Sequence, residues 1–134
     1  MKNLKEITPL LLTLSLVFTG FRCGEDHIEP TKSILGRWEL VENSFGVVTN
    51  PSQYEEYLPD SVLLIYRYNE KTFYQYKYWF NDSLIFKGGI FVDSFGDTAV
   101  VAEPYKYKFI SFNKLRMDFQ YPAINTSYIY KRIK

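Results

Sequence analysis

The sequence has 134 residues, a net charge of +1 at neutral pH and many aromatic residues: 12 tyrosines, 11 phenylalanines and 2 tryptophans. This length suits one compact domain and excludes a multidomain enzyme. One cysteine excludes an internal disulfide, and one cysteine with one histidine cannot supply the four ligands of a structural zinc site. The nearly neutral charge provides no polybasic field for nucleic acid, and 46% hydrophobic residues exclude a disordered chain.

The first 22 residues have the pattern of an export signal. Lys2 and Lys5 precede an apolar run over residues 7–18. As a helix this run would span about 18 Å, which is short of the roughly 30 Å hydrocarbon core of a membrane. We therefore expect residues 1–22 to be a signal peptide rather than a transmembrane helix.

Residues 19–24, which read Thr-Gly-Phe-Arg-Cys-Gly, resemble the lipoprotein signal of diderm bacteria. In that family the cysteine becomes the acylated first residue of the mature protein. The resemblance implies a lipid on Cys23, attachment to a membrane and a place in the cell envelope as an outer-membrane lipoprotein. Glu25 and Asp26 look like the acidic tag of surface-exposed lipoproteins in Bacteroidetes. The alternative is a cleaved, soluble protein with one free thiol on its surface.

A polar segment follows the cysteine. Residues 23–33 contain few apolar side chains and include Pro30, so we expect them to form a flexible tether. His27 lies in this segment, which places the one imidazole of the chain outside the folded domain.

From residue 34 onward, apolar and polar side chains alternate with a period of two, which is typical of β-strands. The expected strands cover residues 37–48, 61–69, 72–80, 83–93, 98–102, 105–109, 115–121 and 126–133. Residues 52–58 are the one candidate helix, because Ser52 and Glu55 have the spacing of a capping box. We predict an all-β fold for residues 34–134, an antiparallel up-and-down barrel of about eight strands, because closure removes the sheet edges.

Gly36-Arg37-Trp38, at the start of the first strand, resembles the Gly-x-Trp signature of lipocalins, and the domain is similar to small lipocalin-like lipoproteins of Bacteroidetes. In lipocalins this tryptophan lies at the closed end of the barrel, and an arginine from late in the chain packs across it. The resemblance implies that Gly36, Trp38 and Arg132 close the barrel, with a cation–π contact between the last two. It also implies a barrel that carries a small ligand.

The sequence predicts no catalytic site. A Ser-His or Cys-His pair is excluded because His27 lies in the tether and Cys23 is expected to be acylated. Glu55 and Glu56 are expected on a solvated polar loop, and no phosphate-binding or dinucleotide motif occurs. We therefore expect a protein that is not an enzyme and that holds no cofactor or metal. Lysines that alternate with tyrosines point to the opposite face, which argues against nucleic acid.

An aromatic strand face is the remaining candidate site. The predicted ligand-binding residues are Tyr57, Tyr66, Tyr68, Tyr74, Tyr76, Tyr78 and Phe80. An eight-stranded barrel is just wide enough either to be filled by side chains or to hold one small ligand, and both interpretations stay open. Residues 51–59, which include Tyr57, form either a lid over the barrel entrance or an ordinary surface loop.

Two functions are consistent with these features. The first is a monomeric, lipid-anchored barrel that binds a small hydrophobic or amphipathic molecule, and it requires an open lumen beside Tyr74, Tyr76 and Tyr78. The second is a filled barrel that acts as a protein-interaction or envelope-accessory module. The second function requires an exposed apolar patch. Its candidate contact residues are Phe73, Trp79, Phe95 and Phe112.

Overall fold

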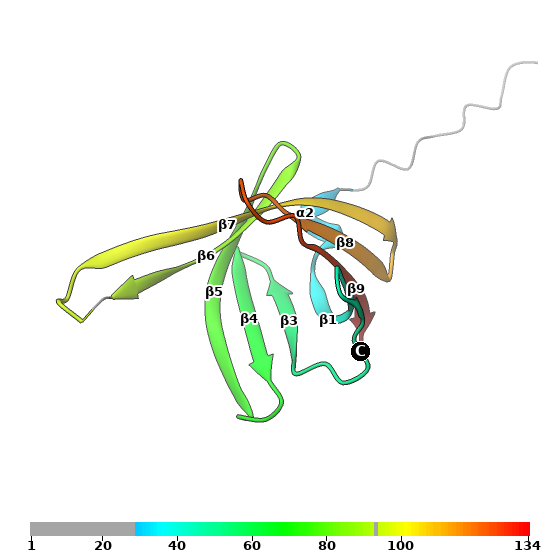
Figure 1. The fold of residues 1–134 in the computed structure, drawn as a ribbon, viewed down its shortest axis with the longest axis horizontal. Coiled ribbons are helices and arrows are strands. Elements are labelled where there is room, and N and C mark those ends of the chain that lie inside the picture. Colours follow the sequence, from blue (N-terminus) through cyan, green and yellow to red (C-terminus); the bar gives the residue numbers. More distant parts are fainter. Residues whose placement is uncertain (1–28, 93) are drawn as a thin grey trace, which may run out of the picture.

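The computed structural model describes residues 29–92 and 94–134. The predicted signal peptide, Cys23 and most of the predicted tether lie outside the described residues. Within them, the chain forms one short helix and nine strands (Figure 1): α2 (Pro30–Ser33), β1 (Gly36–Asn43), β2 (Gly46–Val47), β3 (Gln53–Leu58), β4 (Val62–Arg67), β5 (Thr72–Asn81), β6 (Leu84–Val92), β7 (Thr98–Ser111), β8 (Lys114–Phe119) and β9 (Ser127–Ile133).

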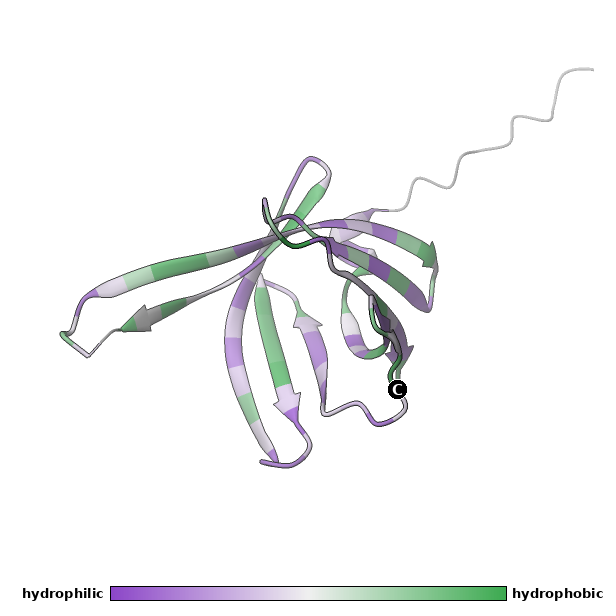
Figure 2. Ribbon diagram, in the orientation of Figure 1, coloured by the Kyte–Doolittle hydropathy of each residue, from purple (hydrophilic) through white to green (hydrophobic). Residues whose placement is uncertain are grey.

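The strands form an eight-stranded antiparallel barrel, as the sequence predicts. From β3 to β9 each strand pairs with the next one along the chain, β1 pairs with β3, and β1 also pairs with β9 to close the sheet on itself. The two-residue strand β2 pairs only with the end of β1 and adds a small hairpin outside the ring. In β8 polar and apolar residues alternate one by one, which Figure 2 shows as purple and green bands, whereas β4 is green along most of its length.

The predicted number of barrel strands is correct, although the prediction missed one strand and divided another into two. The candidate helix over residues 52–58, within the segment 51–59 that was expected as a lid or a surface loop, is instead strand β3, which pairs with both β1 and β4. Its inward positions are polar at Gln53 and Glu55, which hides the usual alternation of apolar and polar side chains. The two predicted strands at 98–102 and 105–109 form the single strand β7, which contains Pro104.

Pro104 is tolerated because of the direction in which its backbone atoms point. Its carbonyl accepts a hydrogen bond of 2.9 Å from the backbone N–H of Gln120, on the side of β7 that faces β8. The nitrogen of a strand residue points to the same side as its carbonyl, so the missing N–H is not needed for pairing with β6.

One end of the barrel is filled by large side chains. Those less than 2% exposed are Ile34, Trp38, Tyr57, Leu63, Ile85, Leu115 and Met117. The same core includes Tyr78. Three partly buried rings pack against it: Phe80, Tyr107 and Phe109. This part of the lumen is a close-packed core.

Arg132 closes this end by joining the last strand to the segment before the first. Its guanidinium carbon lies 4.2 Å from the centroid of the Trp38 ring. The guanidinium also donates hydrogen bonds to the carbonyls of Ser33, at 2.7 Å, Leu35, and Phe112, at 2.9 Å. One side chain therefore holds four parts of the chain together at the closed end.

Trp38 and Gly36 complete this arrangement. The indole N–H of Trp38 donates to the carbonyl of Ile34 at 2.6 Å, so the turn after α2 is fixed across the end of the barrel. Gly36 has a φ of +110°, and a Cβ at this position would lie 2.8 Å from Nη1 of Arg132. Only glycine combines this backbone conformation with so close a guanidinium.

A two-stranded ribbon projects from the other part of the barrel (Figure 1). β5 pairs with β6 only as far as Gly88, whereas β6 and β7 remain paired from Gly89 and Val101 out to Val92 and Thr98. β5 and β6 therefore separate at Gly88.

Candidate binding cavity in the barrel lumen

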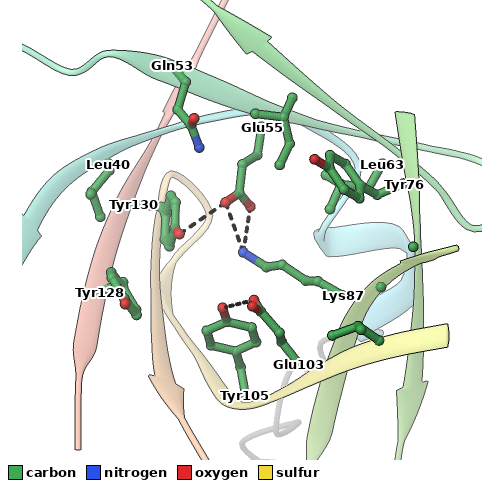
Figure 3. Close-up of a pocket in the computed structure, with 14 residues that line it drawn as sticks. Leu40, Gln53, Glu55, Leu63, Tyr76, Lys87, Glu103, Tyr105, Tyr128 and Tyr130 are labelled. Carbon is green, nitrogen blue, oxygen red and sulfur yellow. Dashed lines mark hydrogen bonds and ion pairs between the residues drawn. The ribbon is translucent and has the colours of Figure 1, made fainter. Parts of the chain in front are cut away.

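The lumen beyond the filled end contains a cavity of about 360 Å³. Its lining comes from seven of the eight barrel strands (Figure 3): Leu40, Gln53, Glu55, Leu63, Ile65, Tyr76, Lys87, Gly88, Gly89, Val101, Glu103, Tyr105, Tyr128 and Tyr130. This volume lies within the range of about 300–1,000 Å³ that small-molecule sites occupy. The barrel is thus filled at one end and hollow at the other.

A buried ion pair crosses the cavity floor. The Nζ atom of Lys87 lies 2.9 Å and 2.7 Å from the two carboxylate oxygens of Glu55, and both residues are less than 10% exposed. The hydroxyl of Tyr57 donates to Oε2 of Glu55 at 2.6 Å, and that of Tyr130 donates to Oε1 at 3.1 Å. Each oxygen of Glu55 therefore accepts from Lys87 and from one tyrosine, which offsets the cost of burying its charge.

Tyrosine rings cover the rest of the Lys87 ammonium. Its nitrogen lies 4.8 Å from the ring centroid of Tyr105, 5.1 Å from that of Tyr130 and 5.9 Å from that of Tyr57. At these distances the negative faces of the rings attract the cation. Lys87 is thus held by one carboxylate and three rings.

Glu103 is a second carboxylate in the lining, and it lies on the exposed side of the cavity. The hydroxyl of Tyr105 donates to its Oε2 at 2.7 Å. No ion pair of Glu103 with a lysine or arginine is found among the described residues. The lining therefore contains two carboxylates and one ammonium, and its formal charge is −1.

The tyrosines of this network have raised pKa values. Burial, and then the negative charge of Glu55, raises the pKa of Tyr57 and of Tyr130 well above its ordinary value. Burial and the hydrogen bond to Glu103 raise the pKa of Tyr105. All three hydroxyls therefore stay protonated and act as donors at neutral pH.

These shifts predict that the fold loses stability in alkali. The ordinary pKa of tyrosine is about 10. Below this pH, Tyr57 and Tyr130 are protonated in both the folded and the unfolded chain, so their full contribution to the free energy of unfolding is present. Above it the unfolded chain releases these protons while the folded chain retains them. Each tyrosine then lowers the free energy of unfolding by about 1.4 kcal/mol per pH unit. Urea unfolding from about pH 8 to about pH 11 should show this fall, with a shallower slope in Tyr130→Phe. Equal slopes in the two proteins would contradict the assignment.

Two further hollows adjoin the cavity. One, of about 360 Å³, shares Leu40, Gln53, Glu55 and Tyr130 with it and is also lined by the loop between β2 and β3. The other, of about 260 Å³, shares Tyr76, Gly88 and Gly89 and lies where β5 and β6 separate. Trp79, Ile90 and Val100 line that second hollow together with Gln75 and Lys77, so it extends from the lumen toward the outer surface with a mixed lining.

The predicted aromatic wall is divided between the cavity and the core. Of the seven predicted ligand-binding residues, Tyr76 lines the cavity. Tyr57 and Tyr78 belong to the filled end, where their ring centroids are 5.0 Å apart and the Tyr78 hydroxyl donates to the carbonyl of Leu58 at 2.8 Å. Phe80 packs there against Tyr107. Tyr74 shares their strand face but is exposed, and its hydroxyl donates to Glu70.

The placement of Tyr66 and Tyr68 on this wall is wrong. The register of β4 and β5 sets Leu63 opposite Tyr76 and Tyr66 opposite Phe73. Because Leu63 and Tyr76 line the cavity and side chains alternate along a strand, Tyr66 points outward. It packs there against Tyr54, which is also in ring contact with Tyr68, and the Tyr68 hydroxyl donates to Glu39. Alternation within one strand does not set its register with the next.

The central residues of the cavity were missed. Glu55 was expected on a solvated loop, but it is buried because β3 is a barrel strand. Lys87, Glu103, Tyr105, Tyr128 and Tyr130 were not predicted as site residues. One signal was available, since Lys87 lies between Ile85 and Gly89 at an inward position of an apolar strand. A lysine there requires a buried counter-charge.

No family model and no curated protein matches this chain. In the part of the chain that the structure describes, no helix has the length and apolarity needed to cross a membrane. The same residues contain no group of three histidine, cysteine, aspartate or glutamate side chains placed to hold a metal ion.

Proposed function

We propose that this barrel binds a small amphipathic molecule in its lumen. The observation that carries the proposal is the cavity of about 360 Å³ around the Glu55–Lys87 pair. Leu40, Leu63 and Ile65 supply apolar surface on one part of the lining, while tyrosine hydroxyls and carboxylates supply polar groups on another. A few polar groups set in an apolar concave surface are typical of ligand sites.

We propose further that a lipid on Cys23 holds the protein in the cell envelope. The export signal and the Gly-x-Trp resemblance to lipocalin-like lipoproteins support this part. The chain enters the barrel at its closed end, and β1 then runs for eight residues, about 25 Å, toward the cavity. Labelling with palmitate tests the anchor, since the label should be absent from Cys23→Ser and its persistence would refute the assignment.

Calorimetric titration with 1-octanol tests ligand binding. A Cys23→Ser protein that begins at residue 23 carries neither the lipid nor the apolar run of residues 7–18, so it avoids detergent, and it should bind one octanol saturably. Ile65→Trp places a large ring in the cavity and should abolish binding. Leu64→Trp is the matched control, because the neighbouring residue points to the outer face and binding should be kept. Binding that survives Ile65→Trp, or no binding by the unsubstituted barrel, would contradict the proposal.

A specific observation also favours a protein-interaction module. In the projecting ribbon, Ile90, Val92, Phe95 and Val100 are each more than 60% exposed. Among the strands that the structure describes, residues 89–92 pair only with β7, so their other edge faces no neighbouring strand there. Natural edge strands are usually protected by lysine or proline, which this segment lacks. An extended segment of a partner protein could add to this edge as a further strand.

A photo-cross-linking amino acid at Val100 tests this second function in the producing cell, with the same group at Lys114 as control. One protein should be cross-linked from Val100 and not from Lys114. Ile90→Lys should abolish this adduct, because it places a charge opposite Val100 in the ribbon. Equal adducts from both positions, or an adduct that persists in Ile90→Lys, would rule out docking at the ribbon.

A further inference from the structure

We propose that the lumen selects an amphipathic amine, whose ammonium group binds beside Glu103 and the tyrosine rings of the cavity. This inference rests on the proposed binding function and names the chemical class of its ligand.

The Glu55–Lys87 pair is already complete. Glu55 accepts two contacts from Lys87 and one hydrogen bond each from Tyr57 and Tyr130. Lys87 is the one basic residue of the lining, and its ammonium is enclosed by Glu55 and by tyrosine rings. Within this lining, an anionic ligand would therefore have to break the Glu55–Lys87 pair to reach a positive charge.

Glu103 is the charge that the protein leaves without a cation. Among the described residues its side chain accepts a hydrogen bond from the Tyr105 hydroxyl, a neutral donor, and forms no ion pair, and it is the exposed carboxylate of the lining. Figure 3 shows Glu103 and Tyr105 on the opposite side of Lys87 from Glu55. A ligand ammonium placed there would bring the formal charge of the lining from −1 to zero.

The aromatic rings beside Glu103 also favour an ammonium group in the ligand. Tyr105 and Tyr128 are edge to face, with centroids 6.2 Å apart, and both line the cavity. Lys87 already lies over Tyr105 and Tyr130, so Tyr128 is the ring that a ligand ammonium beside Glu103 could contact without displacing Lys87. A carboxylate with adjoining aromatic faces is a recognition site for organic cations.

The apolar part of the ligand also has a place. The hollow at the separation of β5 and β6 begins at Tyr76 and Gly89 and offers the apolar side chains of Trp79, Ile90 and Val100, with Gln75 and Lys77 also in its lining. An alkyl chain could extend into it from the lumen, with the ammonium group left beside Glu103. The carboxylate of Glu103 and the apolar side chains of this hollow thus lie in different parts of the lining.

Three probes with one chain length test the choice of headgroup: octylamine, which is protonated at neutral pH, octanol and octanoate. Calorimetry on the Cys23→Ser protein should show octylamine binding about tenfold more tightly than octanol, and octanoate more weakly than octanol. Glu103→Gln should remove the advantage of the amine while leaving octanol binding unchanged, since the amide oxygen still accepts from Tyr105. Glu42→Gln, an equal change of charge at an exposed position of β1, should leave all three affinities unchanged.

The outcomes separate the two proposals. Octanol binding with no preference for the amine, or octanoate binding more tightly than octylamine, would overturn the choice of an amine and leave the binding function intact. An amine preference that persists in Glu103→Gln would overturn the assigned position. If none of the three probes binds, the proposed function fails and this inference fails with it.

Discussion

Glu55→Gln is expected to lower the free energy of unfolding by about 3–5 kcal/mol. The substitution keeps the size and an acceptor oxygen of the side chain but leaves the Lys87 ammonium buried without a counter-charge. Urea unfolding at neutral pH measures the effect. Glu56→Gln is the matched control, because that carboxylate pairs with Arg37, whose side chain is 43% exposed. The control should cost about 1 kcal/mol or less. Equal losses in the two variants would show that Glu55 and Lys87 do not form a buried charge pair.

A double substitution separates the lost charge from lost packing. Glu55→Gln with Lys87→Met removes both charges and keeps an acceptor for the hydroxyls of Tyr57 and Tyr130. Replacement of a whole buried ion pair is often nearly neutral, so most of the stability should return. A double variant as unstable as Glu55→Gln alone would mean that shape, rather than an uncompensated ammonium, causes the loss.

Trp38→Ala is expected to cost about 3–5 kcal/mol. The indole is fully buried, donates to the carbonyl of Ile34 and supports the guanidinium of Arg132. Its removal leaves a large cavity at the end where the first and last strands meet. Urea unfolding followed by circular dichroism measures the change, because this signal does not depend on tryptophan fluorescence.

The other tryptophan is the control for Trp38. Trp79 is 38% exposed on the outer face and stacks on Phe86 with a centroid distance of 5.4 Å. Trp79→Ala should cost about 1 kcal/mol, since part of its surface already lies in water. If both substitutions destabilise the protein equally, Trp38 does not have the closing role that its contacts indicate.

The architecture of the barrel could be predicted because strand periodicity is a local property. The alternating tyrosines of β5 are visible in any window of a few residues, and closure follows from the need to pair the two edges. β3 escaped prediction because Gln53 and Glu55 point inward, so its pattern resembles that of a polar loop. Its polarity is explained only by Lys87, which lies 32 positions later in the sequence.

The candidate site depends on register, which is a property of pairs of strands. Tyr76 was predicted correctly as facing the lumen, but the sequence alone did not show that Tyr66 would pair with Phe73 on the outside. The contact between Trp38 and Arg132, which are far apart in the sequence, was expected only through the resemblance to lipocalins. Residues that meet across the lumen are recognised once the strands have been assigned to their neighbours.

The most direct test of the central claim is methyl NMR of the Cys23→Ser protein during titration with octylamine. Leu40 and Ile65 line the cavity, whereas Ile85 and Leu115 lie in the filled end of the same barrel. The methyl signals of Leu40 and Ile65 should shift saturably, and those of Ile85 and Leu115 should not. Shifts confined to exposed methyl groups such as those of Ile90 and Val92, or equal shifts at both ends of the lumen, would contradict a binding site around Glu55 and Lys87.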